Sequence, residues 1–190
     1  MGPRFVWALL VIVALVAGAA VYMVVYRPAV RGPAEGPAER PTPMEVHRPT
    51  STVRVFLPKQ VGANTYLVPM QVKVQATEDL PRVAMEQLIA ASEEQGAGVI
   101  PKGTRVLDAR TRGSVAEVNL SREFVRNFSG DARHEALTLN AILHTMAQFP
   151  GVRRTRILVD GKSVETLGGH LEILDPVAPD PAWLESSGSR

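Results

Sequence analysis

The apolar positions between residues 131 and 170 repeat first with the period of a helix and then with that of a strand. In DARHEALTLNAILHTMAQF they recur at spacings of four and three, which indicates one buried helix face. The residues of that face are Ala132, Ala136, Leu139, Leu143 and Met146. Pro150 and Gly151 end the helix, RTRILV alternates as a strand, and Asp160-Gly161 suits a two-residue hairpin turn. The pattern predicts that this helix and hairpin form the centre of the fold.

Shorter periodic segments precede the central helix. The expected elements are, in order, strand 52–57 ended by Pro58, strand 66–74 with Pro69 at a sheet edge, helix 77–94, strands 104–109 and 114–120, and a short helix with Phe124 and Phe128. In strand 114–120, Ala116, Val118 and Leu120 are expected to face the core. These elements predict an α+β fold, with one small mixed or antiparallel sheet packed on two main helices.

An uncharged apolar run, Phe5–Tyr26, lies near the start of the chain between Arg4 and Arg27. As a helix it would span about 33 Å, enough for a bilayer core, so residues 1–27 are predicted to be a transmembrane signal anchor. A cleaved signal peptide is the alternative, because Ala17-Gly18-Ala19 resembles a cleavage site. The favoured topology is a single-pass protein of the cell membrane with the folded part exported.

The segments around the periodic region differ from it in composition. Residues 28–50 are rich in proline and small residues and predict a flexible linker that reaches at most about 75 Å. Residues 51–176 are expected to form one domain, and residues 177–190 a loose C-terminal tail in which Trp183 packs back.

Charge and cysteine content exclude several classes of function. From Ser51 onward the numbers of basic and acidic side chains are equal, so the domain lacks the basic footprint of a nucleic-acid-binding protein. The chain contains no cysteine, which excludes disulfides and thiolate chemistry. We therefore expect the membrane as a partner and no nucleic acid.

The helical histidines and the adjacent carboxylate are candidate metal ligands. His134-Glu135 begins a zinc-protease motif, but Thr138 stands where the second histidine is required. His144 is ten residues from His134, about 15 Å along a helix, so the two cannot share a metal. A solvated helix face is the favoured interpretation for both. We predict no catalytic residues, no metal site and no cofactor.

Two further groups of residues are candidates for a binding surface. Arg153, Arg154 and Arg156 cluster where the strand after the central helix begins, and could meet an anionic partner. The alternative is that they are edge-strand charges that discourage aggregation. Gly168, Gly169 and His170 form the second group, in which the glycines are expected to bend the chain where a side chain would obstruct.

Several consecutive motifs resemble one known family. The segments FLPKQVGANTYLVPMQVKV and IPKGTRVLDARTRGSVAEVNLSREFVRNF are followed by LTLNAILHTMAQFPGVRRTRILVDGKSVETLGGH. In this order and spacing they are similar to the GerMN domain of sporulation and spore germination proteins, over Val53 to about Pro176. FPGV followed by LVDGKSVETLGGH is the specific part. The chain has one copy of the domain and lacks the lipobox cysteine common in that family.

The resemblance implies a non-enzymatic, extracytoplasmic α+β domain that associates through its surface. The first hypothesis is therefore a membrane-anchored scaffold or binding module of the cell envelope, in sporulation or germination, that contacts envelope proteins or itself. An alternative is a peptidoglycan-binding domain that uses the arginines and the Gly169-His170 loop. A wall hydrolase, with His170 and Glu165 or Asp160 as acid and base, has the weakest support in the sequence.

Overall fold

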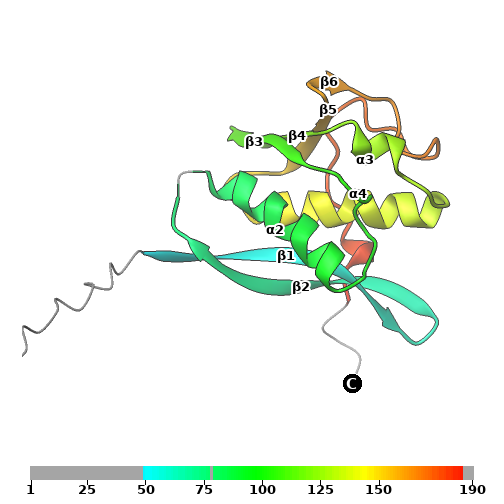
Figure 1. Ribbon diagram of the computed structural model, residues 1–190, viewed down its shortest axis with the longest axis horizontal. Helices are drawn as coiled ribbons and strands as arrows, with labels where there is room; N and C mark the ends of the chain where they lie inside the picture. Colours follow the sequence, from blue (N-terminus) through cyan, green and yellow to red (C-terminus); the bar gives the residue numbers. More distant parts are fainter. Residues whose placement is uncertain (1–48, 78, 186–190) are drawn as a thin grey trace, which may run out of the picture. The chain divides into compact units, whose positions relative to one another are not determined.

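The computed structural model describes residues 49–77 and 79–185 (Figure 1). The predicted anchor and nearly all of the predicted linker lie outside these residues. Within them, no helix is both long enough and apolar enough to cross a bilayer. The chain from His47 onward forms a compact unit of its own, and its buried apolar residues run from Val53 to Ile173.

Strands β1 (Thr50–Val61) and β2 (Asn64–Gln75) form the predicted hairpin. The turn between them contains Gly62 at φ 61°, a conformation that favours glycine. The prediction that Pro58 ends the first strand is wrong. Pro58 lies opposite Leu67 in the hairpin, and β1 continues to Val61. Both strands are edges of a two-stranded sheet, which confirms the edge position expected for Pro69.

A second sheet contains β3 (Val106–Arg112), β4 (Val115–Leu120), β5 (Arg154–Val159) and β6 (Lys162–Ser163), in that order. The pairings are antiparallel, parallel and antiparallel, so this sheet is mixed. The Asp160-Gly161 turn between β5 and β6 has φ values of 47° and 76°, which confirms the predicted hairpin.

The prediction of a single sheet is wrong, because β1 and β2 do not join β3–β6. The outer edge of β1 is occupied by the side chain of Gln148, two residues after the helix that ends at Met146: it accepts from the backbone N–H of Arg54 at 2.7 Å and donates to its C=O at 2.8 Å. At the outer edge of β2, Leu184 forms a bridge with Leu67. These contacts fill positions that a further strand would need.

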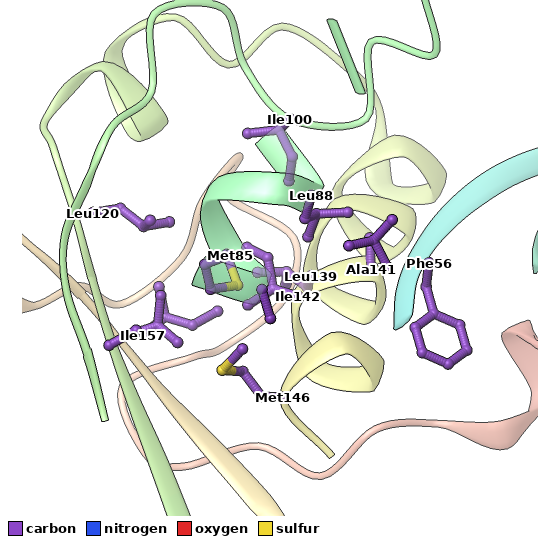
Figure 2. Packing of buried hydrophobic residues seen from close by; sticks show 14 of the residues in the cluster. Phe56, Met85, Leu88, Ile100, Leu120, Leu139, Ala141, Ile142, Met146 and Ile157 are labelled. Carbon is purple, nitrogen blue, oxygen red and sulfur yellow. The ribbon is translucent and has the colours of Figure 1, made fainter. Parts of the chain in front are cut away.

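The helices are α2 (Leu80–Glu94), α3 (Glu123–Arg126) and α4 (Ala132–Met146), and α2 and α4 lie between the two sheets (Figure 1). Every residue of α4 from Glu135 to Met146 is buried. Figure 2 shows Ile142 and Met146 of α4 beside Ile157 of β5, with Phe56 of β1 across the helix. The sequence predicted that only one face of this helix is buried. The structure buries α4 on every side, because one sheet packs on each of two opposite faces.

The C-terminal segment packs against the domain. Val177 forms a bridge with Thr155 of β5, and after the short 3-10 helix η1 (Pro181–Trp183) Leu184 bridges Leu67. The prediction of a loose tail is therefore wrong for residues 177–185, whereas Trp183 does pack against the core as expected. This segment covers one side of α4 and makes residues there buried.

Candidate functional site

A buried carboxylate at the beginning of α4 holds the loop that follows β6. Glu135 is 0% exposed, and its two oxygens accept four hydrogen bonds from Leu167–His170, which we call the glycine loop. Oε1 accepts from the N–H groups of Leu167 at 3.0 Å and Gly168 at 2.9 Å. Oε2 accepts from the N–H of His170 at 3.0 Å and from its Nδ1 at 2.9 Å. The loop is thereby fixed to the helix by one side chain.

These contacts define the protonation of the pair. Burial alone raises the pKa of Glu135, but the amide of Gly168, the imidazole and amide of His170 and the amide of Leu171 outweigh it, and the pKa lies below its ordinary value. The carboxylate is thus ionised at neutral pH and can only accept, so Nδ1 of His170 carries the hydrogen. The His170 side chain is 45% exposed, which leaves Nε2 on the solvent side.

The acceptor capacity of Glu135 is used by its own chain. A carboxylate offers about four acceptor positions, and four donors of the glycine loop occupy them. A water or substrate hydroxyl would have to displace one of these donors before Glu135 could take its proton. The arrangement therefore fits a structural role better than general base catalysis.

The two glycines of the loop are required for different reasons. A Cβ atom on Gly168 would lie 2.4 Å from Cε1 of Phe128 and 3.2 Å from Oε2 of Glu135, so a side chain cannot fit there. Gly169 has open space around it but a φ of 92°, which side chains rarely tolerate. The prediction that a side chain would obstruct is confirmed at Gly168, whereas Gly169 is required for its backbone angle.

A family model fits most of the domain, includes Glu135 and ends just before the glycine loop. The model of the Germane family, described as sporulation and spore germination, matches residues 54–165, more than half of the chain. The chain belongs to the Germane family. A search of the curated proteins gave no match.

Solved structures share the fold of the Germane domain. The tandem GerMN domains of the sporulation protein GerM from Bacillus subtilis align at a TM-score of 0.57 and 15% identity, over 72% of this chain and 48% of that chain. The first GerMN domain of the same protein gives 0.51 and 18%, over 73% and 99%. A candidate lipoprotein from Clostridium perfringens is 26% identical at a TM-score of 0.49, over 68% and 87%. The chain thus spans about half of the tandem structure.

The other histidines of the Germane domain do not join Glu135. His144 is buried, donates its Nε2–H to the carbonyl of Asp180 at 3.0 Å, and its ring lies 5.4 Å from the Phe56 ring. The solvated-face interpretation is therefore wrong for His144, because the C-terminal segment and β1 cover that face. His134 is half-buried, with its ring edge against Phe128 at 5.6 Å.

The acid and base of the hydrolase hypothesis are not brought together. His170 contacts Glu135, whereas Asp160, in the β5–β6 turn, pairs with Arg122 at 3.2 Å, and Glu165 is exposed. In the residues that the structure describes, no three His, Cys, Asp or Glu side chains gather as metal ligands would. An open hollow of about 500 Å³ beside α4 contains only Lys102 and His134 as titratable groups.

The arginines lie at the other end of α4 from the glycine loop. Arg153 and Arg154 are exposed, Arg156 is half-buried, and the first two donate their backbone N–H groups to the carbonyl of Ser114. Arg154 lines one hollow with Glu172, two residues after His170, so the segment that follows the glycine loop reaches the arginines. β6 pairs only with Leu158 and Val159, and beside the arginines that side of β5 forms one bridge, between Thr155 and Val177, so the edge-strand interpretation of these charges stays a prediction.

Glu135 is the site residue that sequence reasoning missed. It appeared only as the second letter of an incomplete zinc motif. A usable signal was present, because Glu135 precedes Leu139 by four and Ile142 by seven residues and so lies on an apolar helix stripe. A lone acid on such a stripe needs buried donors, and the Leu-Gly-Gly-His sequence of the glycine loop supplies them.

Proposed function

We propose that this protein is a membrane-anchored, non-enzymatic binding module of the cell envelope that acts in sporulation or germination through contacts with other proteins. Membership of the Germane family supports the process, and the apolar run Phe5–Tyr26 supports the anchor. The observation that carries the non-enzymatic role is the full occupation of Glu135 by the glycine loop. Such a carboxylate stabilises a surface loop and is unavailable for a reaction.

We place the protein contact on the glycine loop and the residues just after it. Leu171 and Leu174 are 37% and 43% exposed, large apolar side chains on the segment that directly follows the glycine loop, whose backbone is bonded to Glu135 as far as His170. A rigid loop that presents apolar side chains loses little entropy on binding, which favours association with a partner. The imidazole of His170, still exposed beside them, adds a polar contact.

The test is photo-crosslinking in intact cells of the full chain, with the crosslinking residue at Leu174 and, as the control, at the exposed Gln71 of β2. A specific protein adduct from position 174 that is absent from position 71 is expected. No crosslink from either position, or equal crosslinks from both, would contradict the proposed contact. An adduct made only of two copies of this chain would identify self-association as the function.

The non-enzymatic role is tested separately with His170→Ala. Because His170 acts here through its contact with Glu135, we expect a lower melting temperature but retained sporulation or germination in cells that keep normal protein levels. Glu165→Ala serves as the matched control on an exposed carboxylate. Complete loss of function in a stable, normally abundant His170→Ala protein would show that the imidazole takes part in chemistry.

A further inference from the structure

Three arginines, Arg112, Arg154 and Arg156, lie on the outer face of the four-stranded sheet, and an exposed fourth, Arg153, directly precedes β5. We call Arg112, Arg153, Arg154 and Arg156 the arginine patch. Arg112 and Arg154 are both register partners of Val115, on either side of it, so their side chains share one face. The opposite face carries the buried residues Ala116, Val118 and Leu120, so the patch faces away from the helices.

The charge of the patch is not neutralised by ion pairs within the described residues. Arg110, on the same face, is paired with Asp108 and Glu117, whereas none of the four patch arginines forms such a pair. Glu172 and Asp175 line a hollow of about 380 Å³ beside Arg154 and reduce the local field without bonding to it. Three of the four arginines are exposed, so the patch presents free guanidinium groups to solvent.

The patch lies at the end of the domain where the linker enters. Gln148, close after α4, is bonded to Arg54, four residues from the first residue of β1. Gly151 lies against the carbonyl of Gly113 in the β3–β4 turn, next to Arg112. In Figure 1 the start of β1 and the end of β3 accordingly lie on the same side. The linker therefore joins the domain close to its free positive charge.

From this juxtaposition we propose that the arginine patch docks the domain onto anionic phospholipid headgroups of the membrane that holds the anchor. The inference rests on the anchoring in the proposed function. If the predicted linker, residues 28–50, behaves as a random coil, its root-mean-square length is about 25 Å, which would keep the domain close to the bilayer. Each basic side chain near an anionic surface strengthens binding about fivefold, so three exposed arginines give about 100-fold. A 100-fold gain in affinity would bind a free protein to the membrane only weakly, but it is enough to dock a domain that is already tethered to that membrane.

Docking would orient the domain. With the patch on the headgroups, Glu172 and Asp175 beside Arg154 lie near the bilayer, and the glycine loop is held in a fixed orientation to it by its bonds to Glu135. The guanidinium group suits this role because it binds phosphate oxygens in a bidentate manner and stays charged at any physiological pH. Binding should be electrostatic and weaken steeply with salt.

The test uses the full chain in nanodiscs of phosphatidylcholine alone or with about one third phosphatidylglycerol. Because the chain lacks cysteine, Thr111→Cys places a single fluorophore on the exposed residue before Arg112, on the other face of β3, and Ala63→Cys places one at the β1–β2 turn. Headgroup-level spin-labelled lipid should quench the probe at 111 in the anionic discs only, and the probe at 63 in neither. Quenching should disappear in about 0.5 M salt. Equal quenching at 111 in both kinds of disc would overturn the proposal.

Charge-reversal variants identify the residues. Arg112→Glu, Arg153→Glu and Arg154→Glu together should reduce the quenching at 111 at least tenfold. A second triple variant, Lys59→Glu, Lys102→Glu and Arg126→Glu, has the same net charge, lies away from the patch, and should reduce it less than twofold. Melting curves of residues 47–190 check that both triples fold. Equal effects of the two triples would overturn the proposal, since net charge alone would then explain the binding.

Two further outcomes separate this inference from its alternatives. If purified anionic cell-wall polymer binds residues 47–190 more tightly than phosphatidylglycerol vesicles do, and the patch triple abolishes that binding, the patch belongs to the wall and the lipid proposal is overturned. If the crosslink from position 174 persists while lipid docking is absent, the proposed function stands and only the docking fails. If the crosslink from position 174 is lost while lipid docking persists, the docking stands and the proposed protein contact fails.

Discussion

The two ends of α4 each hold a distant segment of backbone, but with side chains of different charge and burial. At the N-terminal end the fully buried, ionised Glu135 accepts four hydrogen bonds from the glycine loop. At the C-terminal end the half-buried, neutral Gln148 makes two bonds with Arg54 of β1 and one with the carbonyl of Thr145. The same helix thus fixes a surface loop with a charge and a sheet edge with an amide.

The difference matters because a buried charge is costly to leave unpaired and a half-exposed amide is not. The contact at Glu135 is therefore the one that cannot be weakened without releasing the loop, whereas water can replace part of the contact at Gln148. We infer that the N-terminal end determines the shape of the proposed binding surface, and that the C-terminal end mainly protects an edge strand from pairing with other chains.

The largest effect is expected when Glu135 is removed. Glu135→Ala leaves three backbone N–H groups and one imidazole N–H without their acceptor, and we expect the free energy of unfolding to fall by about 2–4 kcal/mol. Urea denaturation of residues 47–190 measures it. Glu172→Ala, on an exposed carboxylate, should change it by no more than about 0.5 kcal/mol. A loss below that level in Glu135→Ala would contradict the role of the carboxylate.

A methyl group at Gly168 should have the next largest effect. Its Cβ would lie 2.4 Å from the Phe128 ring, so Gly168→Ala is expected to cost about 1–3 kcal/mol of unfolding free energy. Phe128→Leu in the same chain removes the ring edge and should restore part of this loss. A double-mutant cycle with both single variants measures the coupling, and strictly additive effects would show that the two residues do not meet.

Removing the side-chain amide of Gln148, after the C-terminal end of α4, should lower the free energy of unfolding by less. Gln148→Ala exposes the edge of β1 to water and is expected to lower the free energy of unfolding by about 1 kcal/mol. Hydrogen exchange at the Arg54 amide should accelerate at the same time, which a general destabilisation would not do selectively. Gln71→Ala, opposite Arg54 in the hairpin, is the control and should leave that amide unchanged. Unaltered exchange at Arg54 in Gln148→Ala would refute the edge contact.

The smallest effect is the pH dependence carried by Glu135. Its folded pKa lies below the ordinary value of 4.5, so the folded state binds the proton less well than the unfolded state. The stabilisation is therefore fully present above about pH 4.5 and is lost as the pH falls through the folded pKa. We expect the stability difference between the natural protein and Glu135→Gln to shrink from about pH 7 to about pH 3.5 in urea denaturation. A difference that grows on acidification would show that the pKa is raised.

Much of the local structure could be predicted from the sequence. The period of four and three located α4, and the alternation in β4 correctly placed Ala116, Val118 and Leu120 in the core. The Asp160-Gly161 pair located a hairpin because only a few residues tolerate its backbone angles. These features depend on neighbours within about one helical turn or one hairpin, which the sequence displays directly.

The candidate site could be predicted only in part. Gly168, Gly169 and His170 were singled out, but their partner Glu135 was not, because it is more than thirty positions away in the chain. His144 was assigned to solvent for the same reason, since the residues that cover it come from β1 and from Asp180. A residue's own segment does not reveal which distant segment packs on it.

The sequence by itself determined the order of helices and strands, the turn residues, the family and the expectation of an anchor, because each depends on local periodicity, composition or a contiguous motif. The tertiary structure decided that there are two sheets, that α4 is buried on every side, and that the chain as far as Glu185 packs on the domain. The physical reason is that burial is a property of surfaces brought together by the whole fold. A charge such as that of Glu135 becomes an organising contact only when distant donors surround it.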